Sequence, residues 1–117
     1  MNIGTLFSID LEEVEEVALL DDTNRLVTLL EEIIETSGLE VIGEPLVHHF
    51  TPQGVTYLVL LAQSHLAANT WPEHRFMTVD FFTCGDPVLG QRACEALKRS
   101  IPCHRVVERI IERPSSA

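Results

Sequence analysis

Side chains that can do chemistry gather in a short central stretch of the sequence. They supply a hydroxyl, an imidazole, a carboxylate and a thiol, from Ser64, His65, Glu73 and Cys84. Each stands near the end of a short segment that reads as a β-strand, and core packing alone gives no reason for this combination. The stretch therefore predicts a functional site built at strand ends.

The same stretch carries a specific series of short motifs. In order they are Phe50-Thr51-Pro52-Gln53-Gly54-Val55-Thr56, Ser64-His65-Leu66, Thr70-Trp71-Pro72-Glu73, Val79-Asp80 and Phe82-Thr83-Cys84-Gly85-Asp86. Together they resemble the processing and active-site region of the prokaryotic S-adenosylmethionine decarboxylase proenzyme family. The resemblance is close from Phe50 to Asp86 and is a looser match of pattern and length outside that stretch.

The resemblance implies a self-made cofactor, because members of this family generate a pyruvoyl group from an internal serine. A decarboxylase needs an electron sink for the developing carbanion, and a carbonyl cofactor supplies one where side chains cannot. Here the serine is Ser64 and the cleavage site is Gln63–Ser64. Most family members carry glutamate before the serine. Gln63 keeps that shape without the charge, and the reacting carbonyl belongs to the backbone.

Other positions acquire roles from the same resemblance. Cys84 corresponds to the proton donor for the product carbanion, Phe50 to an aromatic that stacks on adenine, and Glu73 to a carboxylate that holds the ribose hydroxyls. Thr56 falls where the family uses a serine in processing, and it keeps the hydroxyl. His65, next to the reactive serine, is expected in the substrate site.

Asn69 departs from the family, which carries a histidine at this position. That histidine serves processing and also faces the adenine. Processing includes a β-elimination that needs a base to remove the serine Cα proton. Asparagine can hold a hydrogen bond but cannot act as a base near neutral pH. His65, His48 or His49 could substitute, and the sequence leaves open which of them does.

The net charge of −10 is unevenly distributed along the chain. Residues 1–63 hold twelve acidic residues and one basic residue, which gives −11, whereas residues 64–117 hold six acidic and seven basic residues, which gives +1. Such an acidic chain repels phosphate backbones, so we expect no nucleic-acid partner. The acidic half either forms a solvated face or helps to attract a cationic substrate.

Cysteine usage and hydropathy indicate a cytoplasmic protein. The start at Met1 has no basic region of a signal peptide, and no apolar run is long enough to span a bilayer, so no membrane association is expected. Cys84, Cys94 and Cys103 are an odd count without Cys-x-x-Cys spacing, which argues against disulfides and against a metal site. Cys94 and Cys103 are expected to be small buried side chains.

Periodicity predicts an α+β fold with the element order β-α-β-β-β-β-α-β. One helix is capped at Asp21-Asp22-Thr23 and stopped by Ser37-Gly38; the other starts at Asp86-Pro87 and ends at Pro102. The expected strands cover 5–11, 39–50 with a break at 43–45, 55–61, 66–71 and 75–83, with a last strand marked by Val106, Val107, Ile110 and Ile111.

These elements imply a two-layer α/β sandwich, a mainly antiparallel sheet with two helices on one face. The other sheet face then needs a cover, and a second copy of the chain is the simplest one, so a homodimer is expected. Residues 1–113 should form a single S-adenosylmethionine decarboxylase-like domain and 114–117 a tail. The predicted core includes Leu26, Leu29, Leu30, Ile33, Ile34, Val59 and Leu97.

Three functions remain open from the sequence. The first is a pyruvoyl-dependent S-adenosylmethionine decarboxylase that acts in polyamine biosynthesis. The second keeps the cofactor but decarboxylates a smaller basic amino acid such as ornithine or arginine. The third is a non-processing, non-catalytic homologue, which the replacement at Asn69 favours.

Overall fold

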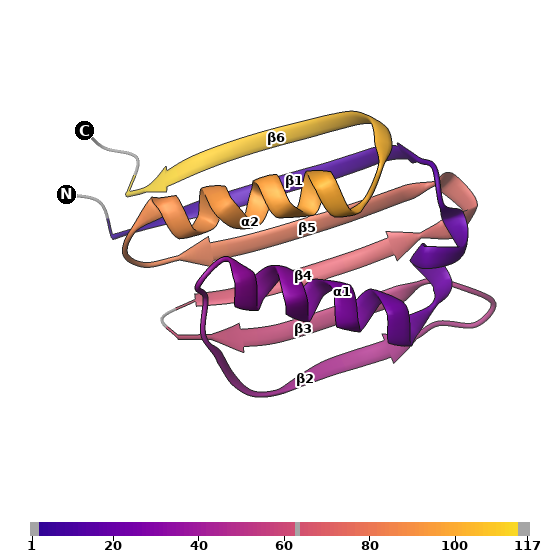
Figure 1. Cartoon of the computed structure of the whole chain (residues 1–117), viewed down its shortest axis with the longest axis horizontal. Helices are drawn as coiled ribbons and strands as arrows, with labels where there is room; N and C mark the ends of the chain where they lie inside the picture. Colours follow the sequence, from indigo (N-terminus) through magenta and orange to yellow (C-terminus); the bar gives the residue numbers. More distant parts are fainter. Residues whose placement is uncertain (1–2, 63, 115–117) are drawn as a thin grey trace.

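The computed structural model describes residues 3–62 and 64–114, which form one antiparallel sheet with two helices on one face (Figure 1). The predicted α+β two-layer sandwich is therefore confirmed. Gln63, the residue before the expected reactive serine, lies outside the described residues, as do residues 115–117 of the predicted tail. The elements are β1 (Gly4–Val14), η1 (Val17–Asp21), α1 (Thr23–Thr36), β2 (Val41–His49), β3 (Val55–Leu61), β4 (Ser64–Trp71), η2 (Pro72–His74), β5 (Phe76–Thr83), α2 (Pro87–Ser100) and β6 (Cys103–Arg113).

The six strands follow the spatial order β2-β3-β4-β5-β1-β6, and every neighbouring pair is antiparallel. The first strand of the chain therefore lies inside the sheet, between β5 and β6. Its register sets Phe7 opposite Phe81 on one side and Ile110 on the other. The Phe7 and Phe81 rings stack with their centroids 5.0 Å apart.

Helix α1 begins and ends where the sequence predicts. The carboxylate of Asp22 accepts a hydrogen bond of 3.1 Å from the backbone N–H of Arg25, which satisfies one free donor of the first turn. Gly38 follows the helix with a φ of +86°, a conformation that side chains with a Cβ rarely adopt. Leu29 was predicted to be buried and is only partly buried, because it lies on the flank of the helix beside an open groove.

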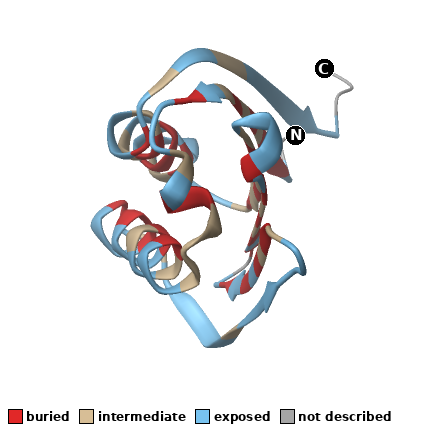
Figure 2. Cartoon of the chain, turned by 90° about the vertical axis from the view of Figure 1, so that its right-hand side faces the viewer, coloured by how far each residue is buried: buried red, intermediate tan, exposed pale blue. Residues whose placement is uncertain are grey.

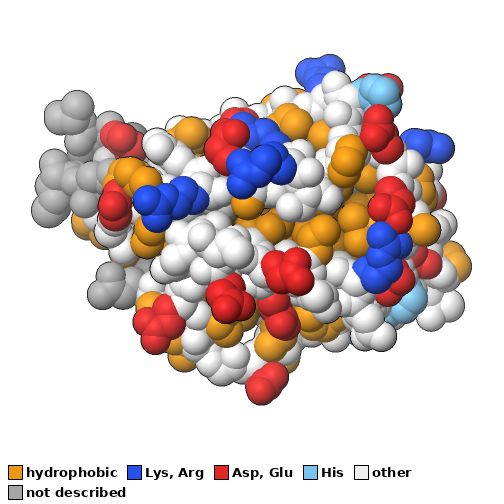
Figure 3. Space-filling view, viewed as in Figure 1, with side chains coloured by type: hydrophobic (Ala, Val, Ile, Leu, Met, Phe, Trp, Pro, Cys, Tyr) orange, Lys and Arg blue, Asp and Glu red, His pale blue; other side chains and the backbone are white. Residues whose placement is uncertain are grey.

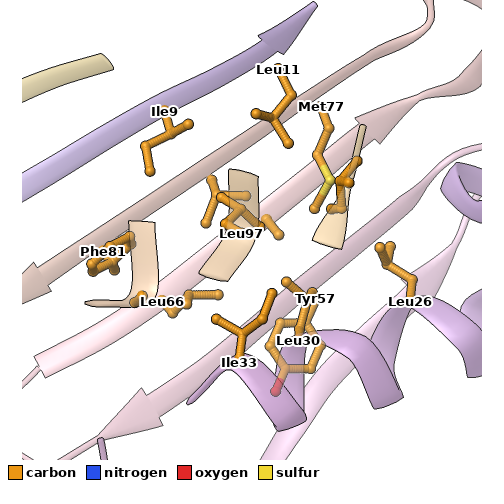
Figure 4. Packing of buried hydrophobic residues seen from close by; sticks show 14 of the residues in the cluster. Ile9, Leu11, Leu26, Leu30, Ile33, Tyr57, Leu66, Met77, Phe81 and Leu97 are labelled. Atoms are coloured by element: carbon orange, nitrogen blue, oxygen red, sulfur yellow. The ribbon is translucent and has the colours of Figure 1, made fainter. Parts of the chain in front are cut away.

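Helix α2 starts at Pro87 after an Asp86 cap that accepts from the backbone N–H of Val88 at 3.0 Å. Gly90 lets this helix approach the sheet, because a Cβ there would lie 2.3 Å from the Phe7 ring. The two helices and the sheet enclose one cluster of buried apolar side chains (Figure 4). Apart from Leu29, the predicted core residues belong to it: Leu26, Leu30, Ile33, Ile34, Val59 and Leu97.

The sheet face opposite the helices, called here the open face, is covered by no helix among the described residues (Figure 2). Alternation along β4 places Ser64, Leu66 and Ala68 under the helices and the intervening residues on the open face. Large apolar side chains stand exposed there, including Leu58 at 43% and Leu60 at 58%. Neither α1 nor α2 is long and apolar enough to cross a lipid bilayer.

Candidate active site

Ser64 and Cys84 line the same pocket at one end of the sheet. Ser64 is the first residue of β4, two residues earlier than the sequence predicted, and it pairs with Thr83 at the end of β5. Cys84 follows Thr83 directly and precedes the Asp86 cap of α2. The cavity measures about 260 Å³ and is closed on its other side by the segment after α1, residues 38–40. We refer to it as the Ser64 pocket.

Two hydroxyl groups in the Ser64 pocket have no hydrogen-bond partner among the described residues. They are Ser64 Oγ and Thr83 Oγ1, both buried, and their residues face each other across β4 and β5. A buried hydroxyl without a partner costs free energy, on the order of 1–3 kcal/mol. Sites that carry this cost are candidates for function, and the sequence analysis had not singled out Thr83.

The three cysteines have different environments, which separates Cys84 from the other two. Cys94 lies in the core at 1% exposure, and burial raises the pKa of its thiol to about 12. Burial also raises the pKa of the Cys103 thiol, which donates a long contact of 3.6 Å to the carbonyl of Arg105. Of the three, only Cys84 lines the Ser64 pocket.

A second cavity, the Phe50 pocket, lies at the opposite end of β4 and measures about 310 Å³. The turn between β2 and β3 brings Phe50 to it, and the backbone N–H of Phe50 donates to Gly54 at 2.8 Å. Phe50 is 48% exposed, and its ring packs edge-on against His48, with ring centroids 4.5 Å apart. Glu73, in the short turn η2, also lines this pocket, which gathers the two residues expected to hold a nucleoside.

Thr56 and Asn69 stand next to each other in the Phe50 pocket. They are directly paired residues of β3 and β4, and the Thr56 hydroxyl donates a hydrogen bond of 2.7 Å to Asn69 Oδ1. The carboxamide oxygen is thereby satisfied within the chain. Its NH₂ group makes no such contact with the described residues and is left as a donor toward the pocket.

The three candidate histidines occupy different surroundings. His48 is the cross-strand partner of Thr56, so His48, Thr56 and Asn69 form one row on the open face. His65 follows Ser64 in sequence but points to the open face, where its ring lies 6.2 Å from that of Phe82. His65 lines neither the Ser64 pocket nor the Phe50 pocket.

His49 is engaged elsewhere, through a contact that the sequence analysis missed. Asp21 Oδ1 accepts a hydrogen bond of 2.8 Å from His49 Nε2 and another of 2.9 Å from the backbone N–H of Gly54. These two bonds lower the pKa of the Asp21 carboxyl, the Gly54 contact more than the His49 contact. Asp21 thus ties η1 to the turn that carries Phe50. Nothing distinguishes it in the sequence from Asp22, its capping neighbour.

The Ser64 and Phe50 pockets cannot serve one small substrate within a single chain. Ser64 and Asn69 are five residues apart on β4, about 17 Å at roughly 3.3 Å per strand residue. Alternation also turns their side chains to opposite faces of the sheet.

The structure was also searched for a metal site. No three His, Cys, Asp or Glu side chains of residues 3–62 and 64–114 are grouped to hold a metal ion.

The Ser64 pocket combines a buried serine hydroxyl with a thiol at the strand ends of a six-stranded α+β sandwich, which marks it as a candidate enzyme active site. Comparison with known proteins specifies the family. A family model described as S-adenosylmethionine decarboxylase matches residues 5–114. A relative named S-adenosylmethionine decarboxylase proenzyme from Prochlorococcus marinus (strain MIT 9313) is 42% identical over 84 residues. That match covers 72% of this chain and 66% of the relative, just under two thirds of its length.

Solved structures agree with this match. The crystal structure of the adenosylmethionine decarboxylase from Aquifex aeolicus VF5 superposes with a TM-score of 0.88 at 33% identity, covering 96% of this chain and 91% of that one. A Trypanosoma brucei AdoMetDC-delta26 monomer shares the fold alone, with a TM-score of 0.68 at 14% identity, and is matched over 48% of its length. The chain belongs to the S-adenosylmethionine decarboxylase family.

Proposed function

We propose that the chain is a self-processing, pyruvoyl-dependent decarboxylase that acts on S-adenosylmethionine. The observation that carries this proposal is the buried Ser64 hydroxyl, which lacks a partner among the described residues and shares a pocket with Cys84. Within a family of decarboxylase proenzymes, this is the arrangement needed for a serine that reacts with its own backbone and a thiol that acts afterwards.

The residues of the Ser64 pocket fit a cofactor made from Ser64. Ser64 Oγ attacks the carbonyl carbon of Gln63, and the peptide bond is exchanged for an ester. Removal of the Ser64 Cα proton then expels the carboxylate of Gln63 and leaves dehydroalanine, whose hydrolysis releases ammonia and leaves a pyruvoyl group on the new N-terminus. The orphaned Thr83 hydroxyl lies beside the site and is free to hydrogen-bond the new carbonyl oxygen.

The remaining residues bind substrate and move a proton. A pyruvoyl group would supply the carbonyl that accepts the electron pair left when carbon dioxide departs. Cys84 then delivers the proton of its thiol to the carbon that has lost the carboxylate. Phe50 stacks on the adenine, Glu73 accepts hydrogen bonds from the ribose hydroxyls, and the Asn69 NH₂ is available to an adenine nitrogen. The product would donate aminopropyl groups in cytoplasmic polyamine biosynthesis.

The functional unit is proposed to be a homodimer. Exposed Leu58 and Leu60 on the open face offer apolar area for a second copy. The Phe50 pocket also opens on this face, at the end of β4 opposite to Ser64. A two-fold arrangement that reverses the strand direction would bring the Phe50 pocket of one protomer toward the Ser64 end of the other. The dimer would thereby bring the residues of the Phe50 pocket to the end of the partner's sheet at which β4 begins with Ser64, whose own side chain faces the helices.

The asparagine at position 69 favours two alternative functions. Since the family's histidine faces adenine as well as serving processing, its loss weakens the case for a nucleoside substrate and favours a smaller one, such as ornithine or arginine. The same loss removes the processing base, and Asn69 Oδ1 is already occupied by Thr56. A chain that never cleaves would act as a non-catalytic partner of other proteins.

Intact mass and carbon dioxide release distinguish the three functions. The purified chain is analysed by mass spectrometry, and release of carbon dioxide is measured from carboxyl-labelled S-adenosylmethionine, ornithine and arginine. Two fragments beside uncleaved or ester-stalled chain, and release from S-adenosylmethionine alone, are expected, with both lost in Ser64→Ala. Release from an amino acid instead would identify the second function. A chain that stays uncleaved, releases no carbon dioxide and is not cut by hydroxylamine would overturn the proposal and leave the third.

A further inference from the structure

A groove of about 380 Å³ lies between the end of α1 and an exposed face of α2. One wall is the end of α1, with Thr36 and its neighbour Ser37, and the other is the face of α2 that carries Arg92, Glu95 and Arg99. None of the residues that line it belongs to the two pockets of the candidate active site. This α1–α2 groove is therefore a separate feature on the helix side of the molecule.

The two arginines of the groove differ from the other basic side chains of the protein. The chain has eight Lys and Arg residues against eighteen Asp and Glu residues. In the part of the chain that the structure describes, six of the eight are engaged in ion pairs, in a hydrogen bond to a backbone carbonyl or in a contact with an aromatic ring: Arg25, Arg75, Lys98, Arg105, Arg109 and Arg113. The remaining two, Arg92 and Arg99, form no ion pair among the described residues, and both are exposed in this groove.

The α2 wall of the groove offers positive charge in a chain that is acidic elsewhere. Figure 3 shows acidic side chains gathered over α1 and β2, with Lys and Arg side chains mainly over α2 and β6. The third charged residue of this wall, Glu95, accepts an ion pair of 3.0 Å from Lys98 Nζ. Two guanidinium groups are thereby left with their donors available, in the fork geometry that matches a carboxylate or a phosphate.

The spacing of the two arginines requires an extended ligand. Arg92 and Arg99 are two helical turns apart, about 10.5 Å between their Cα atoms at roughly 1.5 Å per residue. Glu95 stands between them on the same face, so the middle of the ligand must tolerate a carboxylate. In an extended peptide, side chains three residues apart are separated by about 10 Å, and backbone N–H groups between them can donate to that carboxylate.

The α1 wall offers acceptors and thereby distinguishes a peptide from an inorganic polyanion. The Thr36 hydroxyl donates to the carbonyl of Glu32 at 2.8 Å, and the Ser37 hydroxyl donates to the carbonyl of Ile33 at 2.6 Å. Their hydrogens are used within α1, so toward a ligand the hydroxyl oxygens can only accept. The C-terminal end of a helix also carries partial negative charge. A chain of phosphates would be repelled by this wall, whereas a peptide backbone supplies N–H donors to it.

We propose that the α1–α2 groove is a docking site for an extended acidic segment of a partner protein, with two carboxylates three residues apart. The carboxylates pair with Arg92 and Arg99, and backbone N–H groups of the segment face Glu95 and the end of α1. Val88, which is 42% exposed at the edge of the groove, gives apolar contact to a side chain beside the first carboxylate. The proposal depends on neither cleavage nor decarboxylation.

A titration followed by amide NMR tests the site directly. The probe is an acetylated and amidated octapeptide, Gly-Ser-Glu-Ala-Ser-Glu-Ser-Gly, added to the parent and to the uncleaved Ser64→Ala at low salt. It should bind both proteins with a Kd of about 1 mM or below and shift amide signals of α2 and of the end of α1. The same peptide with two glutamines should bind at least about tenfold more weakly, since both charge-assisted contacts are lost. Binding should weaken as salt is added, because the charges are exposed.

Substitutions locate the binding on α2. Arg92→Gln/Arg99→Gln should weaken the acidic peptide by about tenfold or more. Arg92→Lys/Arg99→Lys keeps the charge but loses the fork, and it should weaken the peptide by about threefold. Arg105→Gln is the matched control, because it removes the same charge from an exposed side chain of β6. Its affinity should stay within about twofold of the parent, as expected for a surface charge outside the site.

Several results would overturn the proposal. They are absence of binding at about 10 mM peptide, far above the expected Kd; equal weakening by Arg105→Gln and the double glutamine variant; and sodium triphosphate binding as tightly as the peptide, which would show a general anion site. If the double glutamine variant fails to fold, Arg92→Gln and Arg99→Gln are measured singly, with about threefold weakening expected of each. Unchanged affinity in both single variants would then exclude the groove.

Discussion

The hydroxyl of Thr56 donates a hydrogen bond of 2.7 Å to Asn69 Oδ1 across the β3–β4 pair. By the resemblance described above, these are the two positions at which the family is expected to carry a serine and a histidine. The two residues are therefore direct neighbours, and the threonine hydroxyl satisfies the carboxamide oxygen of Asn69. A change at one position alters the hydrogen bonding of the other, so their effects should not be additive.

The first prediction concerns restoration of the base. Asn69 supplies no proton acceptor, so self-cleavage of the parent should be slow, incomplete or stalled at the ester. Within one chain position 69 lies too far from Ser64, but in the proposed homodimer it lies toward the Ser64 end of the partner. Asn69→His should therefore accelerate conversion into two chains, by on the order of 100-fold, the usual contribution of a positioned base. Thr56→Ser/Asn69→His should be at least as fast, because it restores the family pair. Denaturing gels and mass spectrometry over time measure the conversion.

Hydroxylamine gives this prediction a control, because it attacks esters. It should cut the parent at Gln63–Ser64 if the reaction stalls there, and it should leave Ser64→Ala intact. Rapid and complete cleavage of the parent would show that another group already acts as the base. Absence of cleavage in both the parent and Asn69→His would favour the non-catalytic function.

The second prediction identifies the histidine that substitutes for the missing base. His48 shares a cross-strand row with Thr56 and Asn69, with its Cα about 10 Å from that of Asn69 at roughly 4.8 Å between strands. His49 is hydrogen-bonded to Asp21, and His65 lies near Phe82 at the other end of the open face. His48→Ala should therefore slow the residual cleavage more than His49→Ala or His65→Ala. A block in His65→Ala alone would assign the base to the neighbour of the reactive serine.

The third prediction separates cleavage from turnover at Cys84. In the proposed mechanism the thiol acts after the cofactor forms. Cys84→Ala should therefore cleave at the rate of the parent, while productive decarboxylation falls by about 100-fold or more with loss of its proton donor. Cys94→Ala is no equivalent control, since Cys94 is a core residue, but Cys103→Ser is more exposed and should turn over normally. Turnover of Cys84→Ala at the parental rate would remove the thiol from the site.

The fold was largely predictable because each element carries local signals. Asp22 and Asp86 cap the two helices, glycine ends the first of them, and the alternation of β3 repeats along β4 and β5. The position of β1 between β5 and β6 was not predictable, since it depends on long-range pairing such as Phe7 with Phe81. The prediction that Leu29 is buried was wrong for a related reason. Helical spacing shows which residues form the apolar stripe of α1, but it does not show how much of that stripe the sheet covers.

The site was predictable in its residue types and not in its geometry. Motif spacing gathers Ser64, Asn69 and Cys84 into one stretch of sequence, but the rise and alternation of β4 separate the first two by length and by face. Asp21 and Thr83 carry no local signal, because one acts through a backbone N–H more than thirty residues away and the other through a neighbouring strand. Such contacts exist only once the chain has folded.

The fourth prediction tests the open face as a dimer interface. Leu58→Glu/Leu60→Glu places two carboxylates among apolar side chains that a second copy would bury, which should raise the dimer Kd by about tenfold or more. Val88→Glu is the matched control, because Val88 is similarly exposed, at 42%, but lies on α2. Light scattering at several concentrations measures both. A parent that is monomeric at micromolar concentration would contradict the predicted homodimer.

The fifth prediction follows from the Asp21 contacts with His49 and Gly54. Both bonds favour the charged carboxylate, so the pKa of Asp21 in the folded protein lies below its ordinary value of 3.8. A depressed pKa contributes stability at pH values above 3.8, and that contribution is lost as the pH falls through the folded pKa. Asp21→Asn should therefore lower Tm near neutral pH, and the difference from the parent should shrink below pH 3.8.

Three further measurements make the Asp21 test specific. Glu32→Gln removes an equal charge from exposed α1 and should leave Tm nearly unchanged, as surface substitutions usually do. His49→Ala should reproduce part of the Asp21→Asn effect, because the Gly54 N–H still bonds to the carboxylate. Since the turn fixed by Asp21 carries Phe50, Asp21→Asn should also raise KM for S-adenosylmethionine more than it lowers kcat. A variant that loses stability while KM stays unchanged would show that Asp21 supports the fold and does not position the Phe50 pocket.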